Sequence, residues 1–243
     1  MTYCVSMLLQ EGVLFASDSR TNAGVDHIAT FRKMHIFQDG SDRRIVIVSA
    51  GNLATTQSVI SLLQKQVKQN DEHLLSLHSL YDVATLVGKT VREVIKRDSG
   101  QEAQAGVDYS CSLLVGGQIR GEQPRLFNIY SQGNFIEATV DTPYFQIGES
   151  KYGKPIIDRV INAKTPLAQA VKCALISFDS TIRSNISVGP PIDVLLHRTD
   201  DFALHEPFRF EESHPYLQQL RSGWSAGLNQ VFSSMPDVDI ENV

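Results

Sequence analysis

Three polar residues near the start of the chain are of types that can together hydrolyse an amide bond. Thr2 follows the first methionine, Asp18 lies sixteen residues after Thr2, and Lys33 lies fifteen residues after Asp18. Threonine is small enough for a preceding methionine to be removed, which would leave a residue with both a hydroxyl nucleophile and a free α-amine. An α-amine has an ordinary pKa of about 7.7 to 8.0 and can accept the hydroxyl proton near neutral pH. Thr2 is therefore a candidate N-terminal nucleophile.

The other parts of such a site are also present early in the chain. The positive charge of Lys33 would ease deprotonation of the Thr2 hydroxyl. Asp18 would pair with Lys33 and fix its position, with Arg20 supporting Asp18 from behind. Gly51 stands between a predicted strand and a predicted helix, where no side chain shields its N–H and the helix dipole adds positive potential. This N–H is the candidate donor to an oxyanion.

The pattern of the surrounding residues predicts how these side chains meet. Two apolar, strand-forming runs follow the first residues and are joined at Glu11-Gly12, which predicts a hairpin. The end of its second strand lies beside the start of its first, so we expect Asp18 near Thr2. Two short extended pieces between His27 and Phe37 would bring Lys33 back to the same place.

The rest of the chain alternates between groups of strands and pairs of helices. The period of the apolar residues predicts helices at 53–67, 80–97, 152–161 and 165–182, and further strands at 34–37, 44–49, 111–115, 125–130, 135–140, 144–147, 192–197 and 202–205. This order fits two antiparallel sheets packed face to face with a helical pair outside each, and it also fits an ordinary α+β domain. We expect a single domain over residues 1–243 with a helical C-terminal extension from about residue 206.

The early residues carry a resemblance to proteasome-type β subunits, which are N-terminal-nucleophile hydrolases. The matching features are the N-terminal threonine, the Asp-Ser-Arg run at 18–20, a lysine about fifteen residues later, and Ser49-Ala50-Gly51 between a hydrophobic strand and a helix. Within that family the chain most resembles the bacterial ancestral-type β subunits, the Anbu group, through the run from Asp18 to His27 and the long C-terminal extension. The resemblance covers roughly residues 2–200, and its motifs are dense only in the first fifty.

The resemblance implies a fold, an activity and an assembly. The fold would be the α+β, four-layer αββα sandwich of N-terminal-nucleophile hydrolases. The activity would be that of a threonine peptidase acting on peptides or unfolded proteins inside a self-assembled ring or open helical ring, a homo-oligomer. Gly51 would be the oxyanion donor and Ser49 would line the pocket for the first substrate side chain. No nucleotide motif is present in this sequence, so any ATP dependence would come from a separate ATPase unfoldase.

Downstream of residue 140 the sequence departs from the family pattern. Gly148-Glu149-Ser150 stands where the family has Gly-Ser-Gly, and the best match to the family's Asp-x-x-Ser is the run from Ser184 to Ser187. We take Ser187 as the residue that supports the nucleophile, with Ser150 and Ser184 as alternatives. These departures predict slow turnover, because the α-amine would be less well oriented. The second hypothesis is accordingly a catalytically weak or inactive scaffold or peptide-binding subunit of the same fold, which would also follow if Met1 remained in place.

Composition excludes several other classes of function. A net charge of −5 does not favour a surface for nucleic acid, and no apolar run approaches the roughly 18 residues that span a bilayer. No signal peptide is recognisable, so we expect a cytoplasmic protein without a membrane partner. The three cysteines and seven histidines lack the spacing of metal ligands, and we expect no metal and no cofactor.

Overall fold

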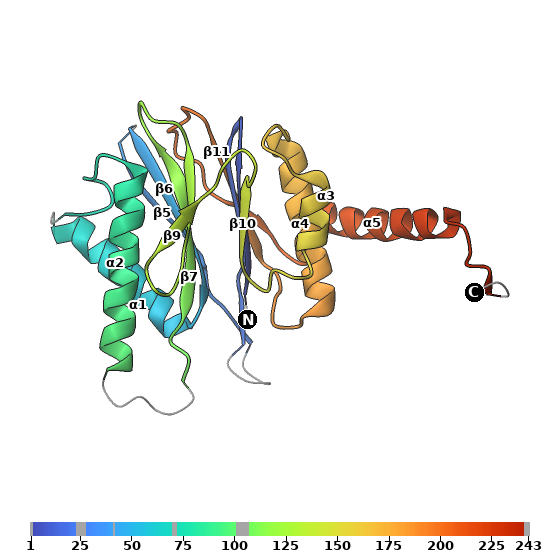
Figure 1. Cartoon of the computed structure of the whole chain (residues 1–243), viewed down its shortest axis with the longest axis horizontal. Helices are drawn as coiled ribbons and strands as arrows, with labels where there is room; N and C mark the ends of the chain where they lie inside the picture. The colour runs from blue at the N-terminus through green and yellow to red at the C-terminus, as the bar shows by residue number, and fades with distance from the viewer. Residues whose placement is uncertain (1, 23–27, 41, 70–71, 101–106, 241–243) are drawn as a thin grey trace.

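Two antiparallel sheets lie face to face between two layers of helices in the computed structural model, which describes residues 2–22, 28–40, 42–69, 72–100 and 107–240 (Figure 1). This arrangement is the α+β, four-layer αββα sandwich that the family resemblance implied. In chain order the elements are β1 (Tyr3–Leu9), β2 (Gly12–Asp18), β3 (Arg20–Asn22), β4 (Ile28–Thr30), β5 (Met34–Asp39), β6 (Arg43–Gly51), α1 (Leu53–Gln69), α2 (Leu80–Ser99), β7 (Cys111–Ile119), β8 (Arg125–Ile129), β9 (Phe135–Glu137), β10 (Tyr144–Gly148), α3 (Lys154–Val160), α4 (Leu167–Ser184), β11 (Ile192–Arg198), β12 (Phe208–Phe210) and α5 (Pro215–Ser234).

The first sheet has the strand order β10-β1-β2-β11-β12. The β1–β2 hairpin is the one predicted at Glu11-Gly12, since Leu9 lies opposite Gly12 and Cys4 opposite Ser17. Both strands are buried along almost their whole length, because α3 and α4 cover one face and the second sheet covers the other. The start of β1 and the end of β2 therefore lie side by side at one end of the sandwich.

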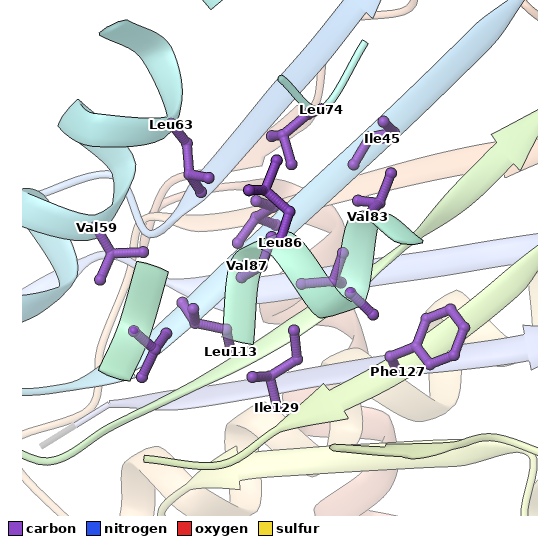
Figure 2. Close-up of a cluster of buried hydrophobic side chains, with 14 of the residues drawn as sticks. Ile45, Val59, Leu63, Leu74, Val83, Leu86, Val87, Leu113, Phe127 and Ile129 are labelled. Carbon is purple, nitrogen blue, oxygen red and sulfur yellow. The ribbon is translucent and has the colours of Figure 1, made fainter. Parts of the chain in front are cut away.

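The second sheet has the order β5-β6-β7-β8-β9 and is covered by α1 and α2. Side chains of α2 such as Val83 and Val87 pack on Ile45 and Leu113 of the sheet (Figure 2). Burial of each such side chain stabilises the fold by about 1.5–3 kcal/mol. The predicted apolar faces of both helices are thus used within the core. Ser79 begins α2 by accepting a hydrogen bond from the N–H of Asp82 at 3.1 Å.

The C-terminal segment differs from its predicted form in two ways. The strand predicted at 202–205 is a loop, and the edge strand β12 follows it at Phe208–Phe210, so the extension does not begin as a helix. Helix α5 then leaves the sandwich beside α4 and projects away from it (Figure 1). Of its residues only Leu217 is buried, and Arg221 ties the helix to Asp179 of α4 at 2.8 Å.

Candidate active site

Thr2 lies immediately before β1. It is held by the end of β10, which pairs with β1 on the side opposite to β2. Its carbonyl oxygen accepts a hydrogen bond from the N–H of Glu149 at 2.7 Å. Gly148, at the end of β10, has φ of +79°, and a Cβ at this position would overlap the Thr2 carbonyl oxygen. Only glycine therefore allows β10 to approach Thr2 this closely. Met1 lies outside the described residues, as do residues 23–27 of the run that resembles the Anbu group.

Asp18 is fully buried at the end of β2 and receives three donors. Its Oδ1 accepts from the N–H of Tyr3 at 3.1 Å and from Nζ of Lys33 at 2.6 Å, and its Oδ2 accepts from the N–H of Gly189 at 3.3 Å. The hydrogen bond to Tyr3 fixes Asp18 against the residue next to Thr2. The structure thus brings the end of β2 to the start of β1, as the hairpin pattern predicted.

Lys33 lies between β4 and β5 and is buried beside Asp18. Its Nζ donates to the Asp18 carboxylate and, at 2.7 Å, to the carbonyl oxygen of Arg20. Two close acceptors compensate for the loss of water around this ammonium group. Burial raises the pKa of the Asp18 carboxyl, while the Lys33 charge and the N–H groups of Tyr3 and Gly189 oppose that rise.

Arg20 supports Asp18 indirectly, through the segment that follows α4. The guanidinium of Arg20 packs over Gly189, where a Cβ would overlap it, and donates to the carbonyl oxygen of Ile186 at 3.1 Å. Ser19 adds a hydrogen bond to the carbonyl oxygen of Pro191 at 2.7 Å. These contacts hold the segment so that the N–H of Gly189 points at Asp18.

Gly51 is the last residue of β6, at the strand-to-helix junction predicted for it. Its φ is +111°, and a Cβ there would approach the Ser110 carbonyl oxygen to 2.5 Å. Asn52 caps α1 by accepting from the N–H of Thr55 at 3.1 Å. The neighbouring Ala50 side chain lies 3.6 Å from where a Cβ on Gly148 would stand, so this end of β6 adjoins the strand that holds Thr2.

The serine predicted to support the nucleophile is placed differently from the other site residues. Ser187 lies in the segment after α4, where its N–H donates to Oδ1 of Asn185 at 2.9 Å. Within the described ranges, no hydrogen bond joins the Ser187 hydroxyl to Thr2, Asp18 or Lys33. Among the described residues, no hydrogen bond joins the hydroxyl of either alternative to these three residues. Ser184 is the exposed last residue of α4, and the N–H of Ser150 donates to the Gly148 carbonyl oxygen at 3.0 Å.

Two residues near Thr2 were not predicted as functional. Asn185 donates through Nδ2 to Oε2 of Glu149 at 2.7 Å, and the Glu149 N–H is bonded to Thr2. One signal for Glu149 was present in the sequence, because this residue stands where the family resemblance implies a serine. No such signal marked Asn185, because its contact with Glu149 depends on where α4 ends.

The part of the chain that the structure describes contains no group of three or more His, Cys, Asp or Glu side chains able to hold a metal ion. Among the same residues, no helix combines the length and the apolarity needed to cross a bilayer.

A family model described as "Proteasome subunit" matches residues 2–196 of the chain. A curated relative, the proteasome subunit beta of Haloquadratum walsbyi, is 22% identical over 214 residues, which are 87% of this chain and 79% of the relative.

Solved structures of bacterial proteins are more similar. Anbu (ancestral beta-subunit) from Yersinia bercovieri is 59% identical with a TM-score of 0.92, over 98% of this chain and 100% of that one. A structure described as the helical assembly of the Anbu complex from Pseudomonas aeruginosa is 54% identical with a TM-score of 0.95, over 99% of both chains.

Proposed function

The chain belongs to the proteasome subunit family, and within it to the Anbu group, and we propose that it is a threonine-type peptidase whose nucleophile is Thr2 after removal of Met1. The observation that carries the proposal is the buried Lys33–Asp18 pair, which is hydrogen-bonded to the residue that follows Thr2. A buried lysine whose charge is matched by one carboxylate supplies a fixed positive potential beside the nucleophile.

Each group has a role in the hydrolysis of a peptide bond. The α-amine of Thr2 takes the hydroxyl proton, and Oγ attacks the substrate carbonyl carbon. The N–H of Gly51 stabilises the oxyanion, and Lys33 lowers the electrostatic cost of forming the alkoxide. The ammonium returns its proton to the leaving amine, which breaks the C–N bond and leaves an ester on Thr2. A water molecule, deprotonated by the same α-amine, then attacks the ester carbonyl carbon. The C–Oγ bond breaks, and the ammonium returns the proton to Oγ of Thr2.

The proposal extends to an assembly of identical subunits in the cytoplasm that acts on peptides or unfolded proteins. Two observations support self-assembly: the Pseudomonas aeruginosa relative is described as a helical assembly, and α5 carries exposed apolar side chains far from the sandwich. A ring or open helical ring would restrict access to Thr2. A separate ATPase unfoldase would be needed only to unfold proteins and deliver them to this assembly.

The second candidate function is a scaffold or peptide-binding subunit with little or no turnover. The observation that favours it is the replacement of the family's serine by the buried Glu149, with Asn185 rather than Ser187 as its partner. A different set of groups around the α-amine would orient it differently and slow the reaction.

Substitution of Thr2 distinguishes the two functions. We expect Thr2→Ala to abolish hydrolysis of a fluorogenic peptide and also covalent capture by a peptide epoxyketone, a probe that reacts with a hydroxyl and an α-amine on one residue. The control is Thr85→Ala, which removes an exposed hydroxyl on α2 and should leave both signals unchanged. If the wild-type protein neither hydrolyses peptides nor captures the probe, the scaffold function is favoured. Unchanged hydrolysis in Thr2→Ala would contradict Thr2 as the nucleophile.

A further inference from the structure

Glu149 is a buried carboxylate beside Thr2 that the hydrolytic steps above do not use. Only 8% of its surface is exposed, and its own N–H is bonded to the Thr2 carbonyl oxygen. A carboxylate removed from water in this way needs partners, because its charge is costly to bury alone. The partners of the Glu149 carboxylate therefore indicate which further group it can bind.

The described partners of Glu149 neutralise its charge only in part. Oε2 accepts from the uncharged amide of Asn185 at 2.7 Å. Oε1 lies 3.1 Å from Nζ of Lys151, whose side chain is 67% exposed, so solvent screens this pair. An ionised carboxylate offers about four acceptor positions, which leaves capacity for another donor.

Two residues with carboxylates of different character hold the backbone around Thr2. The Asp18 carboxylate accepts from the N–H of Tyr3, and the backbone N–H of Glu149 donates to the Thr2 carbonyl oxygen. Residues 185–189 connect them, since Asn185 bonds Glu149 and Gly189 bonds Asp18. Asp18 already has a buried cation at 2.6 Å. Among the described residues, the cation that pairs with Glu149 is the exposed Lys151, so this carboxylate can accept a further cation at the chain end.

We propose that the Glu149 carboxylate, oriented by Asn185, is the ion-pair partner of the Thr2 α-ammonium and so positions the amine beside its own hydroxyl. The inference rests on the proposed function in one respect, because the amine belongs to Thr2 only when Met1 has been removed. Glu149 does not contact substrate in this scheme. It is a positioning residue that acts through the amine.

The pairing sets the pH range in which the amine is a base. A neighbouring carboxylate favours the ammonium form and raises the pKa of the amine, whereas the nearby Lys33 lowers it. The other charged groups around Thr2 are Asp18, which is matched by Lys33, and the solvent-exposed Lys151. Arg20 is held over Gly189 by its hydrogen bond to Ile186. Glu149 is a negative group outside the Lys33–Asp18 pair, so its removal should lower the pKa of the amine.

The test compares Glu149→Gln with the wild-type protein. Both are prepared with Thr2 as the first residue, by cleavage of an N-terminal fusion if Met1 is retained. The pKa of the Thr2 amine is obtained from the pH dependence of its acetylation by acetic anhydride, measured by mass spectrometry of the N-terminal peptide. We expect Glu149→Gln to lower the pKa of the amine by about one unit. At a pH below that pKa, the amine should then be acetylated about tenfold faster than in the wild-type protein. Glu212→Gln, an exposed carboxylate in the loop before α5, is the control and should not change it.

Hydrolysis provides the second readout. In Glu149→Gln the rising limb of the pH–rate profile should move to lower pH by the same amount, while the maximal rate falls because the amine is less well held. A merely structural role of Glu149 would lower the rate without moving the limb. If the amine pKa does not change in Glu149→Gln, the proposed pairing is wrong. If it does change but no variant hydrolyses peptides, the pairing holds and the peptidase function fails.

Discussion

Lys33 is the residue on which the charge balance of the site depends. We expect Lys33→Ala to reduce kcat/KM for a fluorogenic peptide at least a hundredfold, since the positive potential beside Thr2 is lost. The substitution also leaves Asp18 buried without a counter-charge, which costs about 3–5 kcal/mol of the free energy of unfolding. Both effects can be measured, the first by peptide hydrolysis and the second by urea unfolding. Lys65→Ala on the exposed side of α1 is the control, and wild-type kinetics in Lys33→Ala would contradict the assigned role.

Protonation of Asp18 should limit activity at acidic pH. Burial raises the pKa of this carboxyl, so it takes up a proton at higher pH than an exposed aspartate, whose pKa is about 3.9. The protonated form no longer pairs with Lys33. Below the limb set by the Thr2 amine, we therefore expect a second acidic decline in kcat/KM, at a higher pH than an exposed aspartate would give, in a pH–rate profile recorded where the fold remains intact by circular dichroism. A second decline no higher in pH than that of an exposed aspartate would contradict this expectation.

The sequence predicted the meeting of Asp18 with the start of β1 because a two-stranded hairpin leaves little choice of geometry. It predicted neither the Glu149–Asn185 contact nor the packing of Arg20 over Gly189. Both depend on the path of the chain after α4, where short polar segments follow no period that a sequence pattern could reveal. Local pairing was therefore predictable at the site, and contacts between distant loops were not.

At the scale of elements, the approach of β10 to β1 decides where Thr2 lies. We expect Gly148→Ala to abolish hydrolysis and to destabilise the fold, because its Cβ would overlap the Thr2 carbonyl oxygen and the backbone there cannot yield without moving β1. Gly121→Ala is a matched control, since Gly121 also has a positive φ, +89°, but open space around it. The control should cost about 1–2 kcal/mol in urea unfolding for its backbone conformation alone and keep its activity. Equal effects of the two substitutions would show that the contact with Thr2 is unimportant.

The strand predicted at 202–205 shows why an apolar alternation can mislead. Phe202 is buried and Leu204 is 84% exposed, which is not the pattern of a half-buried strand. The backbone carbonyls of this loop are bound instead by polar side chains from the inner face of the second sheet. Gln38 donates to the carbonyl of Phe202, and Arg44 donates to those of Ala203 and His205. Because side chains satisfy these groups, no strand partner is needed. The long helices, by contrast, were predicted because their apolar period extends over several turns.

At the scale of the whole molecule, α5 presents apolar side chains to solvent. Phe232 is 80% exposed, and the neighbouring Leu228, Val231 and Met235 are exposed as well. We expect this face to pack against another copy of the chain in the assembly proposed above. Phe232→Asp should lower the native mass measured by analytical ultracentrifugation, and Asn229→Asp, which adds a charge at a polar position of the same helix, should not. An unchanged mass in Phe232→Asp would exclude this face from the assembly contacts.

Catalysis by Thr2 as an N-terminal nucleophile depends first on the identity of the first residue of the mature protein. The intact mass of the purified wild-type protein measures this directly. We expect a mass lower than that of the full sequence by one methionine residue, with Thr2 carrying the free α-amine. A population that retains Met1 throughout would contradict catalysis by Thr2, because Thr2 would then have no amine to accept its proton.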